Sequence, residues 1–236
     1  MENSKLLIAA AAVLALMPLA YGVANAQTSH DHSAHEAPHS SPLISPIPAS
    51  DDVNFVFSAA PEDHAIGDIF APHTLIVYAS VVCGHCGKWF TDDYPVIKKE
   101  LVDTGKLRLI FREFPTQPAD VAFAGFQLAN CAAPDDYFDA IVYQFQNQEE
   151  TFDRLRIGEG RARFLELAKK AGIQTEDEML ACFENEAGKA RVETAMSRAE
   201  AGGVNAVPAL ILDGKLMPGL NGASHVLAAL GESPKE

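Results

Sequence analysis

The sequence is short of positive charge. Its 236 residues include 18 lysines and arginines against 32 aspartates and glutamates, which gives a net charge of −14 at pH 7. A chain this acidic is repelled by phosphate backbones and by anionic lipid surfaces. The composition therefore argues against nucleic acid, and against an anionic membrane surface, as a partner.

Cysteine is also scarce, and its spacing does not suit a metal site. A structural zinc ion usually takes four ligands from two closely spaced pairs of cysteine or histidine. Only Cys83 and Cys86 form such a pair, because Cys131 and Cys182 stand far apart. We therefore expect no zinc at Cys83 and Cys86, and the remaining sequence contains no recognisable cofactor motif.

Long apolar runs are absent except near the N-terminus. Lys5 precedes an apolar run from Leu6 to Ala20, and Ala24-Asn25-Ala26 then forms a small-x-small cleavage site. This pattern predicts a signal peptide over residues 1–26, cleaved after Ala26. An uncleaved anchor is the alternative, although the run is short for a bilayer. No cysteine follows the run closely, which argues against a lipoprotein, and an even cysteine count fits an oxidising compartment.

Residues 27–50 are rich in histidine and proline and poor in the residues that pack a core. This composition predicts a disordered or extended tether, and its prolines argue against an oligomerising helix. Four histidines in it could bind copper, nickel or zinc loosely, although a solvated linker is the simpler interpretation. They are His30, His32, His35 and His39.

The sequence from Thr74 onward predicts a buried strand that runs directly into a helix. The strand covers Thr74 to Ser80, and Cys83-Gly84-His85-Cys86 follows it. The helix is predicted to extend to Asp103, because apolar residues recur on one helical face. The two cysteines therefore belong at a helix N-terminus.

A helix N-terminus favours a thiolate, because unpaired N–H groups and the helix dipole stabilise negative charge there. A first thiol in a Cys-x-x-Cys pair can have its pKa lowered into the range of about 3.5–7.5. We expect Cys83 to be the nucleophile and Cys86 to resolve the mixed disulfide. His85 adds a positive charge or a donor beside Cys83, and a stabilised thiolate makes the disulfide a better oxidant.

Other elements are predicted from apolar periodicity and turn residues. Thr175 and Glu178 form a capping box for the helix that carries Cys182. Asp213-Gly214 is a tight turn. The predicted strands are 53–57, 107–114, 209–212 and 215–217, and the predicted helices are 119–132, 134–147, 159–171, one beginning at 175, 187–201 and 223–230.

This order of elements resembles that of the DsbA-like thiol:disulfide oxidoreductases. The similarity covers roughly Asp51 to Leu230 and is carried by Cys83-Gly84-His85-Cys86, Val207-Pro208, Phe111 to Pro115 and Asp213 to Lys215. The resemblance implies an α/β thioredoxin fold with an inserted α-helical domain. Its N-terminal part would cover 51–118, the insertion 119–201 and its C-terminal part 202–236.

The resemblance also implies roles for the segment around Pro208. Pro208 would be cis and face the Cys83–Cys86 disulfide, and Val207 would offer its backbone to an extended substrate. Two positions depart from the family pattern. Gly84-His85 replaces the Pro-His common in the oxidases, and Val77 stands where many members have a buried carboxylate six residues before the first cysteine.

Cys131 and Cys182 fall on different helices of the expected insertion, outside any Cys-x-x-Cys motif. We expect a structural disulfide between them, worth about 3–5 kcal/mol by chain entropy. Two buried free thiols and a regulatory bond are the alternatives.

The sequence therefore predicts a monomeric periplasmic oxidase without a cofactor, which introduces disulfides into reduced exported proteins. The resemblance implies reoxidation by a DsbB-like membrane protein. An isomerase or reductase on the same fold is the nearest alternative, because Gly84-His85 also occurs in protein disulfide isomerase domains. Other classes are a metal-binding protein that uses the histidine-rich tether, and a chaperone-like binder in which the cysteines are structural.

Overall fold

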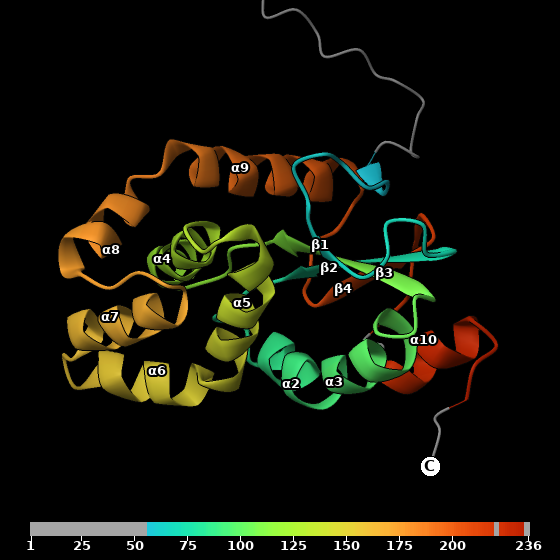
Figure 1. Cartoon of the computed structure of the whole chain (residues 1–236), viewed down its shortest axis with the longest axis horizontal. Helices are drawn as coiled ribbons and strands as arrows, with labels where there is room; N and C mark the ends of the chain where they lie inside the picture. The colour runs from blue at the N-terminus through green and yellow to red at the C-terminus, as the bar shows by residue number, and fades with distance from the viewer. Residues whose placement is uncertain (1–55, 220–221, 234–236) are drawn as a thin grey trace, which may run out of the picture. The chain divides into compact units, whose positions relative to one another are not determined.

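A five-stranded mixed β-sheet forms the centre of the computed structural model, which describes residues 56–219 and 222–233 (Figure 1). The predicted signal peptide and tether lie outside the described residues. Strands β2 and β3 run parallel, and the other neighbours are antiparallel. The strand order is β1 (His64–Ile66), β3 (Leu107–Glu113), β2 (His73–Ala79), β4 (Ala209–Leu212) and β5 (Lys215–Leu216).

The central strand β2 is covered by helices on both faces. Leu75 and Val77 face a large core that includes residues of α2 (Gly84–Asp92) and α10 (Ala223–Ala229). Ile76 and Tyr78 face a second core on the other side of the sheet, and α9 (Glu186–Ala201) packs over this core. A strand buried on both faces reads as a continuous apolar run rather than an alternating one. The burial of both faces explains why the apolar run at 74–80 predicted this strand.

The helix that follows the cysteines is interrupted, whereas the sequence predicted one continuous helix to Asp103. Helix α2 ends at Asp92, α3 covers Tyr94–Ile97, and a π-helical turn, η1, covers Lys98–Val102. Pro95 lies at the start of α3 and has no N–H to continue the hydrogen-bond ladder. The predicted apolar face is nevertheless buried, and it consists of Phe90, Tyr94, Ile97 and Leu101.

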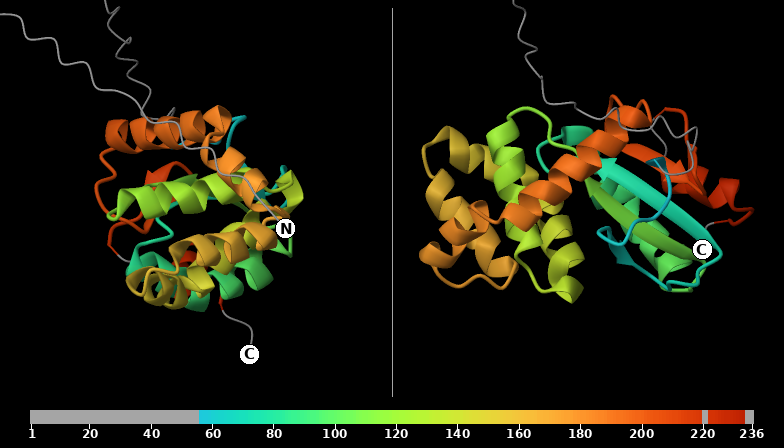
Figure 2. Two further views of the ribbon diagram at one scale, coloured as in Figure 1. Left: turned by 90° about the vertical axis from the view of Figure 1, so that its left-hand side faces the viewer. Right: turned by 90° about the horizontal axis from the view of Figure 1, so that it is seen from above.

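Helices α4 to α8 lie beside the sheet, and α9 runs from them across the sheet (Figure 2); all six fall within the predicted insertion, 119–201. The Thr175–Glu178 capping box is present at the start of α8. Helix α6 was not predicted, because its sequence is mostly polar and only Thr151 on it is buried. The elements beside the sheet are α4 (Ala119–Asn130), the 3-10 turn η2 (Pro134–Asp136), α5 (Tyr137–Gln146), α6 (Gln148–Arg156), α7 (Gly160–Lys170) and α8 (Glu176–Phe183).

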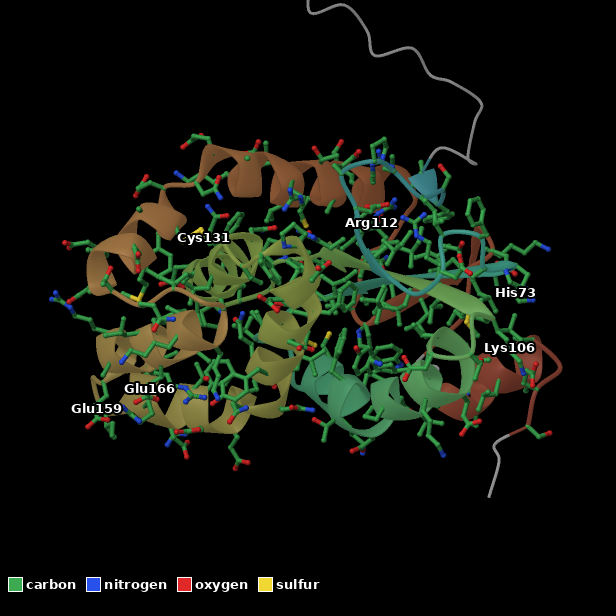
Figure 3. All side chains as sticks on the ribbon, in the orientation of Figure 1. His73, Lys106, Arg112, Cys131, Glu159 and Glu166 are labelled. Atoms are coloured by element: carbon green, nitrogen blue, oxygen red, sulfur yellow. A yellow bond between two sulfur atoms is a disulfide. The ribbon has the colours of Figure 1, made fainter. Side chains whose placement is uncertain are left out.

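The predicted strand at 53–57 is not formed at its two described residues. Val56 and Phe57, its described residues, lie in a helical turn, and the first strand is β1. The segment before β1 is held by a side chain instead of by strand pairing. Arg112 (labelled in Figure 3) donates to the Val56 carbonyl at 3.0 Å and forms a buried ion pair with Asp63 at 2.9 Å.

The described part of the chain contains no helix long and apolar enough to span a membrane.

Candidate active site

The two cysteines of the Cys-x-x-Cys motif lie at the point where β2 leads into α2. Cys83 is the N-cap residue of α2, with extended backbone angles of φ −88° and ψ 119°. Its side chain is half-buried, whereas Cys86 is fully buried in the first turn. Both cysteines are present as free thiols. The structure thus describes the reduced form, with one accessible thiol and one enclosed thiol.

The two thiols have opposite acidities. The pKa of Cys83 is lowered from 9.0 to about 6, first by a hydrogen bond from the Cys86 thiol. The backbone N–H groups of Cys86 and His85 and the charge of His85 lower it further, while partial burial opposes them. Burial raises the pKa of Cys86 far above its usual range, and its hydrogen bond to Cys83 adds to that effect. Cys83 can therefore ionise at neutral pH, while Cys86 holds its proton.

The loop before β4 closes over the accessible thiol. The Val207–Pro208 peptide bond is cis, which is the conformation that the family resemblance implies. In its protonated form the Cys83 thiol donates to the Val207 carbonyl, with an Sγ–O distance of 3.6 Å. Pro208 is buried and Val207 is half-buried. The fold therefore brings Cys83, Cys86, His85 and the Val207-Pro208 segment together where β2 ends and β4 begins.

Gln148 is a site residue that sequence reasoning missed. It is the first residue of α6, and its side-chain N–H group donates to the carbonyls of Val81 at 2.6 Å and Cys83 at 3.1 Å. Its amide oxygen lies against α2, where a Cβ on Gly87 would be 2.7 Å away. The insertion thus holds the loop that carries the nucleophile. No local pattern in the sequence marks Gln148, because its role arises from packing between distant segments.

A buried carboxyl group is present, but in the strand next to β2. Val77 is fully buried at the position where many DsbA-like proteins have an acidic residue. Glu113, at the end of β3, is also buried, and burial raises its pKa. Its carboxyl accepts hydrogen bonds from the Tyr137 hydroxyl at 3.0 Å and from Asn130 at 3.3 Å. These contacts join the sheet to the insertion.

Cys131 and Cys182 form a disulfide bond away from the motif. It joins the C-cap of α4 to α8 across a sequence separation of 51 residues, with a Cα–Cα distance of 5.9 Å. Cys131 is labelled in Figure 3.

Within residues 56–219 and 222–233, no group of three or more histidine, cysteine, aspartate or glutamate side chains is arranged to hold a metal ion. The four histidines of the tether lie outside these ranges.

Comparison with known proteins agrees with this architecture. Residues 59–231 match the protein family described as Thioredoxin. No curated protein sequence matches the chain. Among solved structures, α-DsbA1 of Wolbachia pipientis matches with a TM-score of 0.66 at 21% identity, covering 76% of this chain and 94% of that one.

Two further solved structures have the same fold. BdbD of Bacillus subtilis, in its oxidised form, matches with a TM-score of 0.61 at 18% identity, over 72% of this chain and 91% of that one. A protein-disulfide isomerase of Novosphingobium aromaticivorans matches with a TM-score of 0.60 at 19% identity, over 74% of this chain and all of that one. The chain belongs to the thioredoxin family and has the DsbA-like form of its fold, with a helical insertion.

Proposed function

We propose that this protein is a thiol:disulfide oxidoreductase that works as an oxidase and introduces disulfides into reduced exported proteins. The observation that carries the proposal is the opposite acidity of the two thiols at the N-terminus of α2. With its pKa lowered to about 6, Cys83 is mainly thiolate at pH 7. A stabilised thiolate favours the reduced enzyme and makes the Cys83–Cys86 disulfide a stronger oxidant.

The reaction proceeds by two thiolate attacks. A client thiolate attacks the Cys83 sulfur of the oxidised enzyme and forms a mixed disulfide, and the leaving Cys86 sulfur takes up a proton. A second client thiolate then attacks the client sulfur of that bond and expels Cys83 as a thiolate. The client gains a disulfide, two electrons pass to the enzyme, and one of the two client protons remains on Cys86. The low pKa of Cys83 makes it a good leaving group in the second step.

The Val207-Pro208 segment is the proposed site for the client backbone. The Val207 carbonyl lies 3.6 Å from the Cys83 sulfur, so a client chain that reaches this sulfur passes along this segment. An extended chain can pair with such a segment as an added strand does. The backbone would supply affinity without demanding a particular client sequence.

The proposed location rests on the predicted signal peptide, and the proposed partner rests on the family resemblance. A signal peptide over residues 1–26, cleaved after Ala26, would export the protein to the periplasm, where disulfides persist. A DsbB-like membrane protein would take the two electrons and restore the disulfide. We further propose that the mature protein is a monomer, with a tether over 27–50 and thioredoxin-fold parts over 51–118 and 202–236 that flank the insertion, 119–201.

An isomerase or reductase is the second candidate. Gly84-His85 between the cysteines favours it, as does the fold shared with the protein-disulfide isomerase of Novosphingobium aromaticivorans. In this role a DsbD-like partner would keep Cys83 and Cys86 reduced.

The deciding experiment is the equilibrium reduction potential of the Cys83–Cys86 pair, measured in glutathione buffers with mature protein. We expect a potential more oxidising than that of the glutathione pool. A strongly reducing, thioredoxin-like potential would replace the oxidase with the second candidate. The Cys83→Ser variant is the control and should lose all exchange with glutathione at this site.

A further inference from the structure

Three neighbouring hollows that share lining residues follow the N-terminal half of α4. The first, of about 600 Å³, lies between α4, α9 and the loop after α9. The second, of about 410 Å³, shares Phe123 and Glu193 with the first. The third, of about 470 Å³, lies against α7 and α8 and shares Asp120, Ala124 and Phe183 with the second. We call the three hollows together the α4 groove.

Apolar side chains line most of the α4 groove. Phe123 and Phe183 contribute half-buried rings to its middle, and Met196 and Val204 line the end next to α9. At the far end Leu180 is 49% exposed and extends the apolar lining. A long apolar depression of this kind suits an extended polypeptide better than a compact small molecule.

One end of the α4 groove reaches the proposed client-binding loop. Val204 and Asn205 line the first hollow, and Val207, whose carbonyl contacts the Cys83 sulfur, follows two residues later. Two residues of chain span about 7 Å at most. A client segment that lies along Val207 can therefore continue into the α4 groove without leaving the surface.

The rim of the α4 groove carries unbalanced negative charge. Asp120, Glu193 and Glu200 have no ion-pair partner among the described residues. The two basic residues on the rim are already paired, since Arg161 contacts Glu176 and Lys189 contacts both Glu184 and Glu186. Basic side chains from a partner would therefore meet carboxylates at this rim.

We propose that the α4 groove binds the stretch of reduced client polypeptide next to the reacting cysteine, and selects stretches in which apolar residues alternate with lysine or arginine. The apolar residues occupy the hollows, and the basic residues contact the carboxylates of the rim. The identification of the occupant as a client rests on the proposed function. The groove itself can be tested without any redox step.

The test uses two labelled peptides without cysteine, each with serine at the position of the reacting residue. One alternates leucine with lysine, and the other alternates leucine with glutamate. Fluorescence anisotropy measures their binding to the reduced mature protein. We expect the lysine peptide to bind and the glutamate peptide to bind much more weakly. The double variant Glu193→Lys/Glu200→Lys should weaken the lysine peptide by about tenfold at low ionic strength.

The matched control is the double variant Asp135→Lys/Asp136→Lys. These two aspartates are exposed on η2, do not line the α4 groove, and give the same change in net charge. Binding of the lysine peptide should be nearly unchanged in this control. Equal binding of both peptides, or equal loss in both double variants, would overturn the proposal.

The position of the peptide is tested by crosslinking from the groove. A photoreactive benzoylphenylalanine in place of Phe123 should capture the lysine peptide. Capture of the chain's own residues 42–50 instead, undisturbed by added peptide, would overturn the proposal. Oxidation of cysteine-containing versions of both peptides is measured separately. Selective binding without oxidation would reject the proposed oxidase function but support peptide binding in the α4 groove. Oxidation without selective binding would support the oxidase function but reject peptide binding in the α4 groove.

Discussion

A thiol at the N-cap of a helix can accept hydrogen bonds from the backbone N–H groups of the first turn. Cys83 receives them from His85 and Cys86, and the Cys86 thiol adds another. Cys86, one turn further along, is buried, and this burial outweighs the backbone hydrogen bond of Ser80 that would favour its thiolate. Cys83 therefore acts as the nucleophile and Cys86 as the resolving thiol because of where each lies at the N-terminus of α2.

Alkylation of the reduced protein should follow the ionisation of Cys83. Its rate should be half-maximal near pH 6, and Cys86 should stay unmodified, because its pKa is raised by burial. Because the folded pKa is depressed below 9.0, the stabilisation of the reduced protein is absent below about pH 6 and grows as pH rises towards 9. Iodoacetamide kinetics and urea unfolding of the reduced form measure the two effects. Half-maximal alkylation near pH 9 would contradict the assignment.

Gly84→Pro should be tolerated and stabilising. Gly84 is the first residue of α2, a position that suits proline, and Cys83 before it already has the extended backbone that a following proline requires. No atom lies within 4 Å of a Cβ at Gly84. We expect the free energy of unfolding to rise by about 0.4–1 kcal/mol in urea. The pKa of Cys83 should stay below 9.0, because the N–H groups that lower it belong to other residues. A loss of stability would refute this.

The cysteine motif could be read from the sequence because strand, motif and helix are consecutive. Val207-Pro208 lies 124 residues from Cys83, and only the family resemblance pointed to their meeting. Gln148 gave no signal at all. A lone glutamine at a helix start is usually a solvated residue, and its partners become apparent only when α6 packs against the loop before α2.

Between elements, the contact of α6 with the active-site loop is the one that most directly concerns the chemistry. Gln148→Leu would leave the Val81 and Cys83 carbonyls without this donor. We expect the free energy of unfolding to fall by about 1–3 kcal/mol and the alkylation rate of Cys83 to change. Gln146→Leu, at an exposed position at the end of α5, is the control and should change neither quantity appreciably. Equal effects of Gln148→Leu and Gln146→Leu would show that Gln148 has no specific role at the active site.

The Cys131–Cys182 disulfide closes a loop of about fifty residues within the insertion. Replacement of both cysteines by serine should lower the free energy of unfolding by about 4 kcal/mol. Denaturant unfolding checks the loss, with the Cys83→Ser/Cys86→Ser protein as the control that keeps this bond. An unchanged unfolding midpoint would show that the bond contributes little to stability.

The elements that the sequence predicted best are long and have one apolar face, as α4, α5 and α9 do. The elements that the sequence did not predict are short or mostly polar. Strand β1 is only three residues long at the edge of the sheet, which is too short for an alternating pattern to identify it. Helix α6 is polar on most of its surface, so its periodicity is weak, and contacts with α7 and the active-site loop stabilise it.

For the molecule as a whole, sheet and insertion share one core. Leu75 of β2, Phe126 of α4 and Leu167 of α7 belong to the same buried cluster, and the ring of Phe90 stacks on that of Phe145 at 4.0 Å. Nothing in the described residues separates the helical layer from the sheet as an independent core.

Unfolding of the mature protein should therefore be a single cooperative transition. Trp89 lies buried in α2 and reports on the sheet side by fluorescence, whereas far-ultraviolet circular dichroism is dominated by helices, most of them in the insertion. The two signals should give coincident urea curves. Two separate transitions would mean that the insertion unfolds on its own.

The Gln148 contact limits how far this protein could be miniaturised. Joining residue 118 to residue 186 would remove α4 to α8 and produce a shorter chain that retains α9, both reactive cysteines and the cis-proline loop. It would also delete the only described side chain that binds the carbonyls of Val81 and Cys83. An engineer who trimmed the insertion as an accessory would keep the reactive groups but release the loop that holds the nucleophile in place.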